Sequence, residues 1–180
     1  MNRFLFIFLS FCMFFPLPAS GQAPTPCACT EKSFDIRWQQ ADAVLTATVT
    51  DITTLPKYNR TGQKDLPVAV TFDIQTPFKG VDDDKKTFTL HTSLTRHTCT
   101  GHPFEKGGTY LVFAYEREDF TWMPESLYRF PDGTFDVGGL CGGTKALDTA
   151  RDDLAAIKAK LKKTKRKKGF FKTLGDALTP

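Results

Sequence analysis

The sequence predicts a mainly β domain, a small closed barrel with a short helix before its strands and an amphipathic helix after them. Two observations carry this prediction. Apolar and polar residues alternate over 45–50 and again over 68–75, the pattern of half-buried strands. After Cys141-Gly142-Gly143 the apolar spacing becomes that of one face of a helix.

The first 21 residues are expected to be a signal peptide. Arg3 supplies a positive charge, residues 4–17 are almost wholly apolar, and Ala19-Ser20-Gly21 offers small side chains at a cleavage site. The apolar run is shorter than the roughly 20 residues of a spanning helix; an uncleaved membrane anchor is the alternative. We therefore expect a mature chain that begins at Gln22 and is secreted or periplasmic.

The short helix and the first strands follow in order. Ser33 can cap a helix through Trp38. In the strand 45–50, Leu45, Ala47 and Val49 share one face and the threonines 46, 48 and 50 share the other. The strand 68–75 alternates most cleanly. We expect its core-facing residues to be Val68, Val70, Phe72 and Ile74, and its outward-facing residues to include Thr71, Asp73 and Gln75.

Later elements complete the barrel. Phe88 and Leu90 mark a third strand, and the continuously apolar run 110–115 indicates a strand buried on both faces. Residues 127–130 and 134–137 flank Pro131-Asp132-Gly133, a hairpin signal. A Greek-key barrel of the OB type is favoured and a sandwich is the alternative.

The C-terminal helix carries an apolar stripe of Leu154, Ile157 and Leu161, and Asp148 or Thr149 can cap its start. We place the folded domain at 22–159 and a basic tail at 160–180. Residues 151–180 contain ten Lys or Arg against three Asp, whereas residues 22–150 contain thirteen basic and seventeen acidic residues. The protein is thus a mildly acidic domain with a basic end.

The basic tail is the candidate binding segment. Its basic residues are Lys160, Lys162, Lys163, Lys165, Arg166, Lys167, Lys168 and Lys172, followed at helical spacing by the apolar residues Phe170, Phe171, Leu174 and Leu178. This pattern predicts attachment to a polyanion or an anionic membrane surface. The alternative is a solvated, disordered end. Nucleic acid is not an expected partner outside the cytoplasm.

Four cysteines remain once Cys12 leaves with the signal peptide: Cys27, Cys29, Cys99 and Cys141. In an exported chain they predict two disulfides, with three connectivities open.

An ordered set of motifs resembles the netrin-like domain, including the tissue inhibitors of metalloproteinases. The set comprises Cys27-Ala28-Cys29, the segment 41–47, the segment 72–80 ending in Phe78-Lys79-Gly80, Cys99 ahead of 107–114, and Cys141 before a helix. The resemblance implies an OB-type barrel with the pairings Cys27–Cys99 and Cys29–Cys141. It also implies a secreted, non-enzymatic module that binds an extracytoplasmic protein or polyanion.

Metalloprotease inhibition through Cys27, Ala28, Cys29 and Thr30 is the alternative function. In the inhibitors that this segment resembles, the first cysteine is the mature N-terminus, and its amino group and carbonyl chelate the zinc of the protease. Here residues 22–26 precede Cys27, and an amide nitrogen cannot replace that amine.

No catalytic, cofactor or metal site is expected. Ser93 and Ser126 lie in no nucleophile-elbow context, and no glycine-rich phosphate loop opens a helix. His91, His97, Cys99 and His102 match no closed zinc motif.

Overall fold

The computed structural model describes residues 32–58, 66–94, 101–117 and 133–177, with side chains in the last helix as far as Thr164. Six strands form an antiparallel sheet: β1 (Ala43–Thr54), β2 (Pro67–Lys79), β3 (Thr87–Ser93), β4 (Thr109–Arg117), β5 (Thr134–Asp136) and β6 (Lys145–Ala146). Two α-helices flank it, α1 (Phe34–Gln40) and α2 (Arg151–Ala177). Short 3₁₀ turns cover Pro56–Tyr58, Gly139–Cys141 and Leu147–Thr149.

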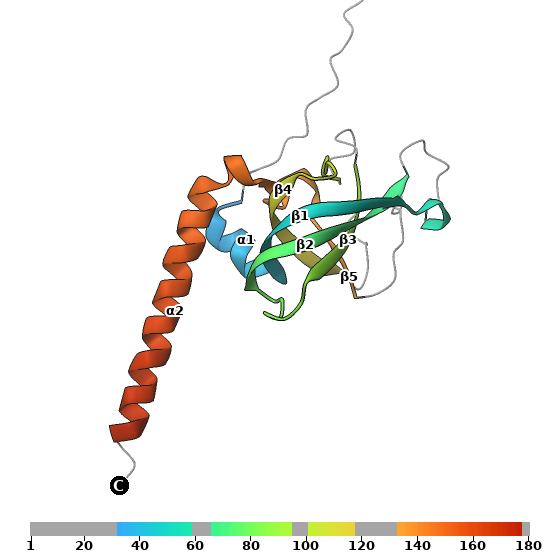
Figure 1. The fold of residues 1–180 in the computed structure, drawn as a ribbon. Coiled ribbons are helices and arrows are strands. Elements are labelled where there is room, and N and C mark those ends of the chain that lie inside the picture. Colours follow the sequence, from blue (N-terminus) through green and yellow to red (C-terminus); the bar gives the residue numbers. More distant parts are fainter. Residues whose placement is uncertain (1–31, 59–65, 95–100, 118–132, 178–180) are drawn as a thin grey trace, which may run out of the picture.

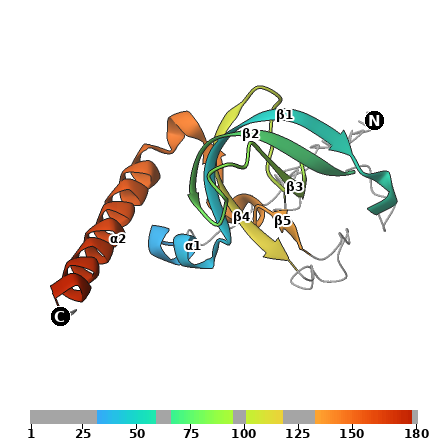
Figure 2. The same ribbon diagram turned by 60° about the horizontal axis from the view of Figure 1, so that its bottom comes forward.

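The strand order is that of a Greek key curled into a barrel. The order is β3-β2-β1-β4-β5, so β4 returns to lie beside β1 after the two hairpins β1-β2 and β2-β3. The outer strands β3 and β5 meet through Phe88 and Phe135, whose ring centroids are 5.0 Å apart. Figures 1 and 2 show the resulting curvature of the sheet. The predicted fold class, a mainly β barrel-like domain with a C-terminal helix, is confirmed.

The interior of the barrel is filled by the alternating residues of β1 and β2. Val68, Val70 and Phe72 are buried, and Ile74 packs against the same cluster. Asp73 and Gln75 are exposed and Thr71 is half-buried, so the predicted register is confirmed. The Phe72 ring meets the Phe104 ring edge-on at 5.2 Å. Register shifts between β1 and β2 bend both long strands, as β-bulges do.

A second apolar layer lies outside the barrel, between the sheet and the helices. Leu111, Phe113 and Tyr115 of β4 pack there, while Tyr110, Val112 and Ala114 face the interior. β4 is therefore buried on both faces, as its apolar run predicted. The outer layer also takes in Ala41, Val44, Ala150 and Ile157, with Phe34, Trp38, Leu154 and Leu161 packed against it.

Three local predictions have different outcomes. Thr46 lies on the opposite face of β1 from Leu45 and Ala47, as predicted, and it is buried because this end of β1 lies under the outer layer. Ser33 stands at the N-cap of α1, as predicted, but its side chain makes no capping hydrogen bond within the described residues. The prediction that Asp148 or Thr149 caps α2 was wrong, because both lie in a 3₁₀ turn before it, where the Thr149 hydroxyl donates to the Ala146 carbonyl.

The C-terminal end of α1 is held by a lysine from β2. The Lys79 ammonium donates to the carbonyls of Trp38, at 2.9 Å, and Ala41. These carbonyls have no partner within a helix that ends at Gln40, so a cation there satisfies them and complements the helix dipole. α1 is thereby fixed to the barrel.

α2 is continuous across the boundary placed at 159/160. Its first turns pack on the outer layer, and the rest of the helix extends away from the barrel in Figures 1 and 2. Of the helices in the described ranges, none is both long enough and apolar enough to cross a bilayer.

Candidate anionic-surface helix and its anchorage

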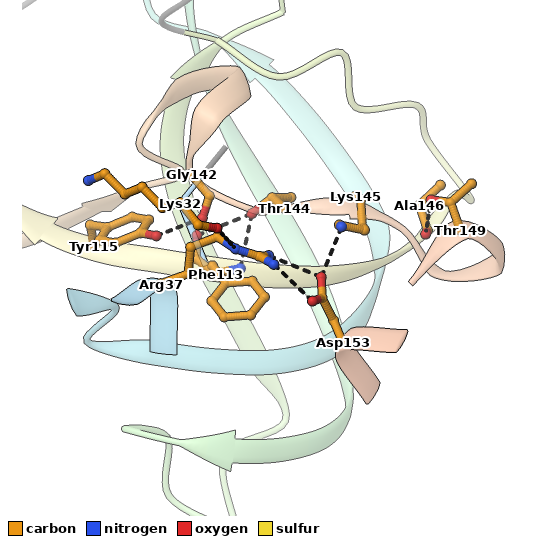
Figure 3. A network of polar contacts seen from close by, with 10 residues as sticks. All are labelled: Lys32, Arg37, Phe113, Tyr115, Gly142, Thr144, Lys145, Ala146, Thr149 and Asp153. Carbon is orange, nitrogen blue, oxygen red and sulfur yellow. Dashed lines mark hydrogen bonds and ion pairs between the residues drawn. The ribbon is translucent and has the colours of Figure 1, made fainter. Parts of the chain in front are cut away.

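The base of α2 is anchored by a buried ion pair to α1. The Arg37 guanidinium donates two hydrogen bonds to the Asp153 carboxylate, at 3.0 and 2.9 Å (Figure 3). Both side chains are almost fully buried, with 6% and 9% of their surface exposed. The Lys145 ammonium of β6 lies 2.9 Å from the second carboxylate oxygen of Asp153. One carboxylate thus joins α1, α2 and β6.

Arg37 is positioned by further contacts around its guanidinium. Its Nε donates to the Lys32 carbonyl at 3.1 Å, and its Cζ lies 5.3 Å from the centre of the Phe113 ring. Gly143 passes so close that a Cβ on it would lie 2.7 Å from Arg37 Cδ. The absence of a side chain at Gly143 therefore gives Arg37 its space.

The environment of Asp153 keeps it ionised. Burial alone would raise the pKa of this carboxyl, but hydrogen bonds from Arg37 and Lys145, with their positive charges, outweigh it and hold the pKa below its ordinary value. The carboxylate accepts hydrogen bonds on both oxygens, which is what a buried charge requires.

The segment before β6 connects this anchor to a disulfide. The Thr144 hydroxyl accepts from the Phe113 amide at 3.0 Å and donates to the Phe113 carbonyl at 3.1 Å. The Tyr115 hydroxyl donates to the Gly142 carbonyl at 2.6 Å. Cys141 is disulfide-bonded, and its partner lies outside the described residues. Beside it is a cavity of about 390 Å³, lined by Lys32, Gln40, Tyr115, Gly138, Cys141 and Gly142.

A second cavity, of about 440 Å³, lies between α1 and α2, one to three turns beyond the anchor. Its lining residues are Phe34, Asp35, Ala156, Ala159, Lys160, Lys163 and Thr164. The Lys160 ammonium is 2.5 Å from an Asp35 carboxylate oxygen and 5.8 Å from the centre of the Phe34 ring. This ion pair is open to water, since 80% of the Asp35 side chain is exposed.

The predicted basic residues all lie on α2. Lys162 and Lys163 are exposed, and Lys160 is half-buried in its pair with Asp35. The helix backbone continues through Lys165, Arg166, Lys167, Lys168, Phe170, Phe171 and Lys172. The predicted segment is therefore a continuation of the packed helix.

The predicted disulfide and inhibitory-segment residues Cys27, Ala28, Cys29, Thr30 and Cys99 fall outside the described ranges, and so does His97. The disulfide pairings and the inhibitory segment thus stay predictions. His91 lies on β3, where burial lowers its pKa, and His102 is buried. The described residues contain no group of three side chains able to hold a metal ion.

Sequence reasoning missed the anchor. The helical spacing could have predicted that Arg37 is buried. Arg37 is three residues after Phe34 and four before Ala41, so it lies on the face of α1 that packs on the outer layer. Asp153 stands in the same relation to Ala150 and Ile157 on α2.

No family model and no curated protein matches this chain.

Proposed function

We propose that this protein is a secreted, disulfide-bonded, non-enzymatic binding module of the netrin-like type that attaches to anionic membrane surfaces through α2. The observation that carries the proposal is the continuity of α2. The same helix that is anchored by Arg37 and Asp153 runs on through the basic segment to Ala177. Its charges are therefore held along one axis, away from the mildly acidic barrel.

The spacing of the apolar residues supports a membrane as the partner. Leu161 packs on the outer layer, and Phe170 follows nine residues later. At about 100° per residue this places Phe170, and Leu174 one turn on, on the opposite side of the helix from Leu161. These positions cannot extend the contact with the barrel. A basic helix with such apolar positions is typical of segments that lie in a membrane interface.

The test is neutralisation of four basic residues of the helix in the full-length protein. The variant Lys165→Gln/Arg166→Gln/Lys167→Gln/Lys168→Gln should bind phosphatidylcholine–phosphatidylglycerol vesicles roughly a thousandfold more weakly, since each basic residue near an anionic surface contributes about 1 kcal/mol. Vesicle co-sedimentation at low salt measures this change.

The matched control removes the same charge from the barrel. Lys57, Lys85, Lys86 and Lys106 are exposed there, and their replacement by Gln should weaken binding far less. Equal losses for both variants would show that net charge, and not α2, determines binding.

The variant Phe170→Ala/Leu174→Ala should lower vesicle binding at high salt and leave heparin binding unchanged. If heparin binding falls equally, the partner is a sulfated polymer.

A further inference from the structure

We propose that the cavity between α1 and α2 is a subsite for the phosphate group of an anionic lipid, and that Asp35 occupies the place of that phosphate in the free protein. The inference rests on the proposed attachment of α2 to anionic membranes. It adds to the basic helix α2 a defined site for one phosphate group, and it makes Asp35 a competitor for that site.

The chemistry of the lining fits such a headgroup. Lys160 and Lys163 supply two cations, and Phe34, Ala156 and Ala159 supply apolar surface beside them. A lipid phosphate carries its charge next to the carbon atoms of its glycerol, so both kinds of surface would be used. A cavity of about 440 Å³ is within the range of small-ligand sites.

Asp35 already makes the contact that a phosphate would make. Its carboxylate oxygen is 2.5 Å from Lys160 Nζ. Hydrogen bonding and attraction from Lys160, together with the charge of Lys163, hold the pKa of Asp35 below its ordinary value. A single anion thus sits within the influence of both lysines, at the place where the charge of a ligand would lie.

The contact is also easy to replace. Asp35 is largely exposed, and ion pairs in water add little to stability. Breaking this pair would therefore cost little, in contrast to the buried Arg37–Asp153 pair that keeps α1 and α2 together. A phosphate can displace Asp35 while the fold stays intact.

The first experiment changes charge at the cavity and compares it with the same change elsewhere. Asp35→Asn should tighten binding to phosphatidylcholine–phosphatidylglycerol vesicles about fivefold, and Lys163→Ala should weaken it about fivefold. The controls are Asp148→Asn and Lys158→Ala, exposed residues that do not line the cavity. We expect less than about a twofold change for each control.

The second experiment fills the cavity without changing charge. Ala159→Trp should weaken vesicle binding several-fold, whereas Ala155→Trp, on an exposed position of the same helix outside the lining, should not. Thermal unfolding of each variant checks that the fold persists. Amide chemical shifts measured with free glycerol phosphate show whether a soluble phosphate ester also enters the site.

The two sets of variants separate the subsite from the proposed function. If the cavity variants and their controls bind vesicles equally, the subsite does not exist, whatever the effect of neutralising residues 165–168. If the cavity variants differ from their controls and neutralising residues 165–168 has no effect, the subsite exists, but residues 165–168 do not attach the protein to membranes. Equal saturation by glycerol phosphate in solution and by vesicles would identify a soluble phosphate ester as the ligand.

Discussion

The ion pairs Arg37–Asp153 and Lys160–Asp35 both join α1 to α2, and they differ in how much water reaches them. Arg37 and Asp153 are buried and share two hydrogen bonds, whereas Lys160 and Asp35 meet at the surface. Removing one partner of a buried pair leaves an uncompensated charge in a poorly solvated place. The exposed pair carries no such penalty, because water replaces the lost partner.

Asp153→Asn should lower the free energy of unfolding by about 3–5 kcal/mol at neutral pH, because it leaves Arg37 without its ionised partner. The effect should depend on pH. The pKa of Asp153 is lower in the folded protein than its ordinary value of 3.8, so its contribution is complete above that pH and disappears as the pH falls through the folded pKa. Urea unfolding from neutral to acidic pH should show the difference between wild type and variant shrinking with acid. A constant difference would contradict the assignment.

Gly143→Ala should be more damaging than a similar change at another left-handed glycine. Gly143 has a φ of +94°, and a Cβ there would lie 2.7 Å from Arg37 Cδ; Gly107 has a φ of +82° and open space. Both variants bear backbone strain, but only Gly143→Ala also displaces Arg37. We expect it to cost at least about 1 kcal/mol more than Gly107→Ala in chemical denaturation. Equal costs would mean that Arg37 adjusts freely.

At the scale of elements, the periodicity of the sequence predicted which faces of the strands are buried. Val70 and Phe72 on β2 and the apolar run of β4 point to buried faces whatever the partner. Periodicity places Thr46 on the opposite face of β1 from Leu45 and Ala47, but it does not say that the outer layer covers this part of that face. The pairing of Arg37 with Asp153 joins residues 116 positions apart, and no local pattern links them. The cavity residue Asp35 was missed for the same reason.

Phe72→Ala should cost about 3–5 kcal/mol, since the side chain is fully buried and its ring meets that of Phe104. Asp73→Ala, one residue along the strand and exposed, is the control and should change stability by no more than about 0.5 kcal/mol. Denaturation midpoints of the two variants test the register of β2. Similar losses at both positions would show the register to be wrong.

At the scale of the molecule, charge and architecture divide the chain in the same way. The barrel lies in the mildly acidic part of the sequence, and the basic residues of the C-terminal part lie along a helix that leaves it. Such a division favours one orientation toward an anionic surface, in which the basic helix faces the surface and the acidic barrel is repelled from it.

We predict that the mature chain is exported, begins at Gln22 and carries the disulfides Cys27–Cys99 and Cys29–Cys141. Each bridge closes a long loop and should add roughly 4 kcal/mol in the chain-entropy description. Peptide mapping without reduction, with sequencing of the N-terminus, measures both expectations. A Cys27–Cys29 or Cys99–Cys141 bridge would remove the connectivity that the netrin-like resemblance implies, and an N-terminus at Cys27 would favour protease inhibition.

Because α2 is one continuous helix, it also sets the rotation about its own axis between the end that packs on the barrel and the far end. Because each residue turns the helix by about 100°, inserting one residue after Thr164 would rotate everything beyond it by that angle while leaving composition and charge almost unchanged. A membrane holding the far end would then face a different side of the barrel. The number of residues between Asp153 and Phe170 would therefore determine which part of the barrel is presented to the surface and which stays open to a second partner.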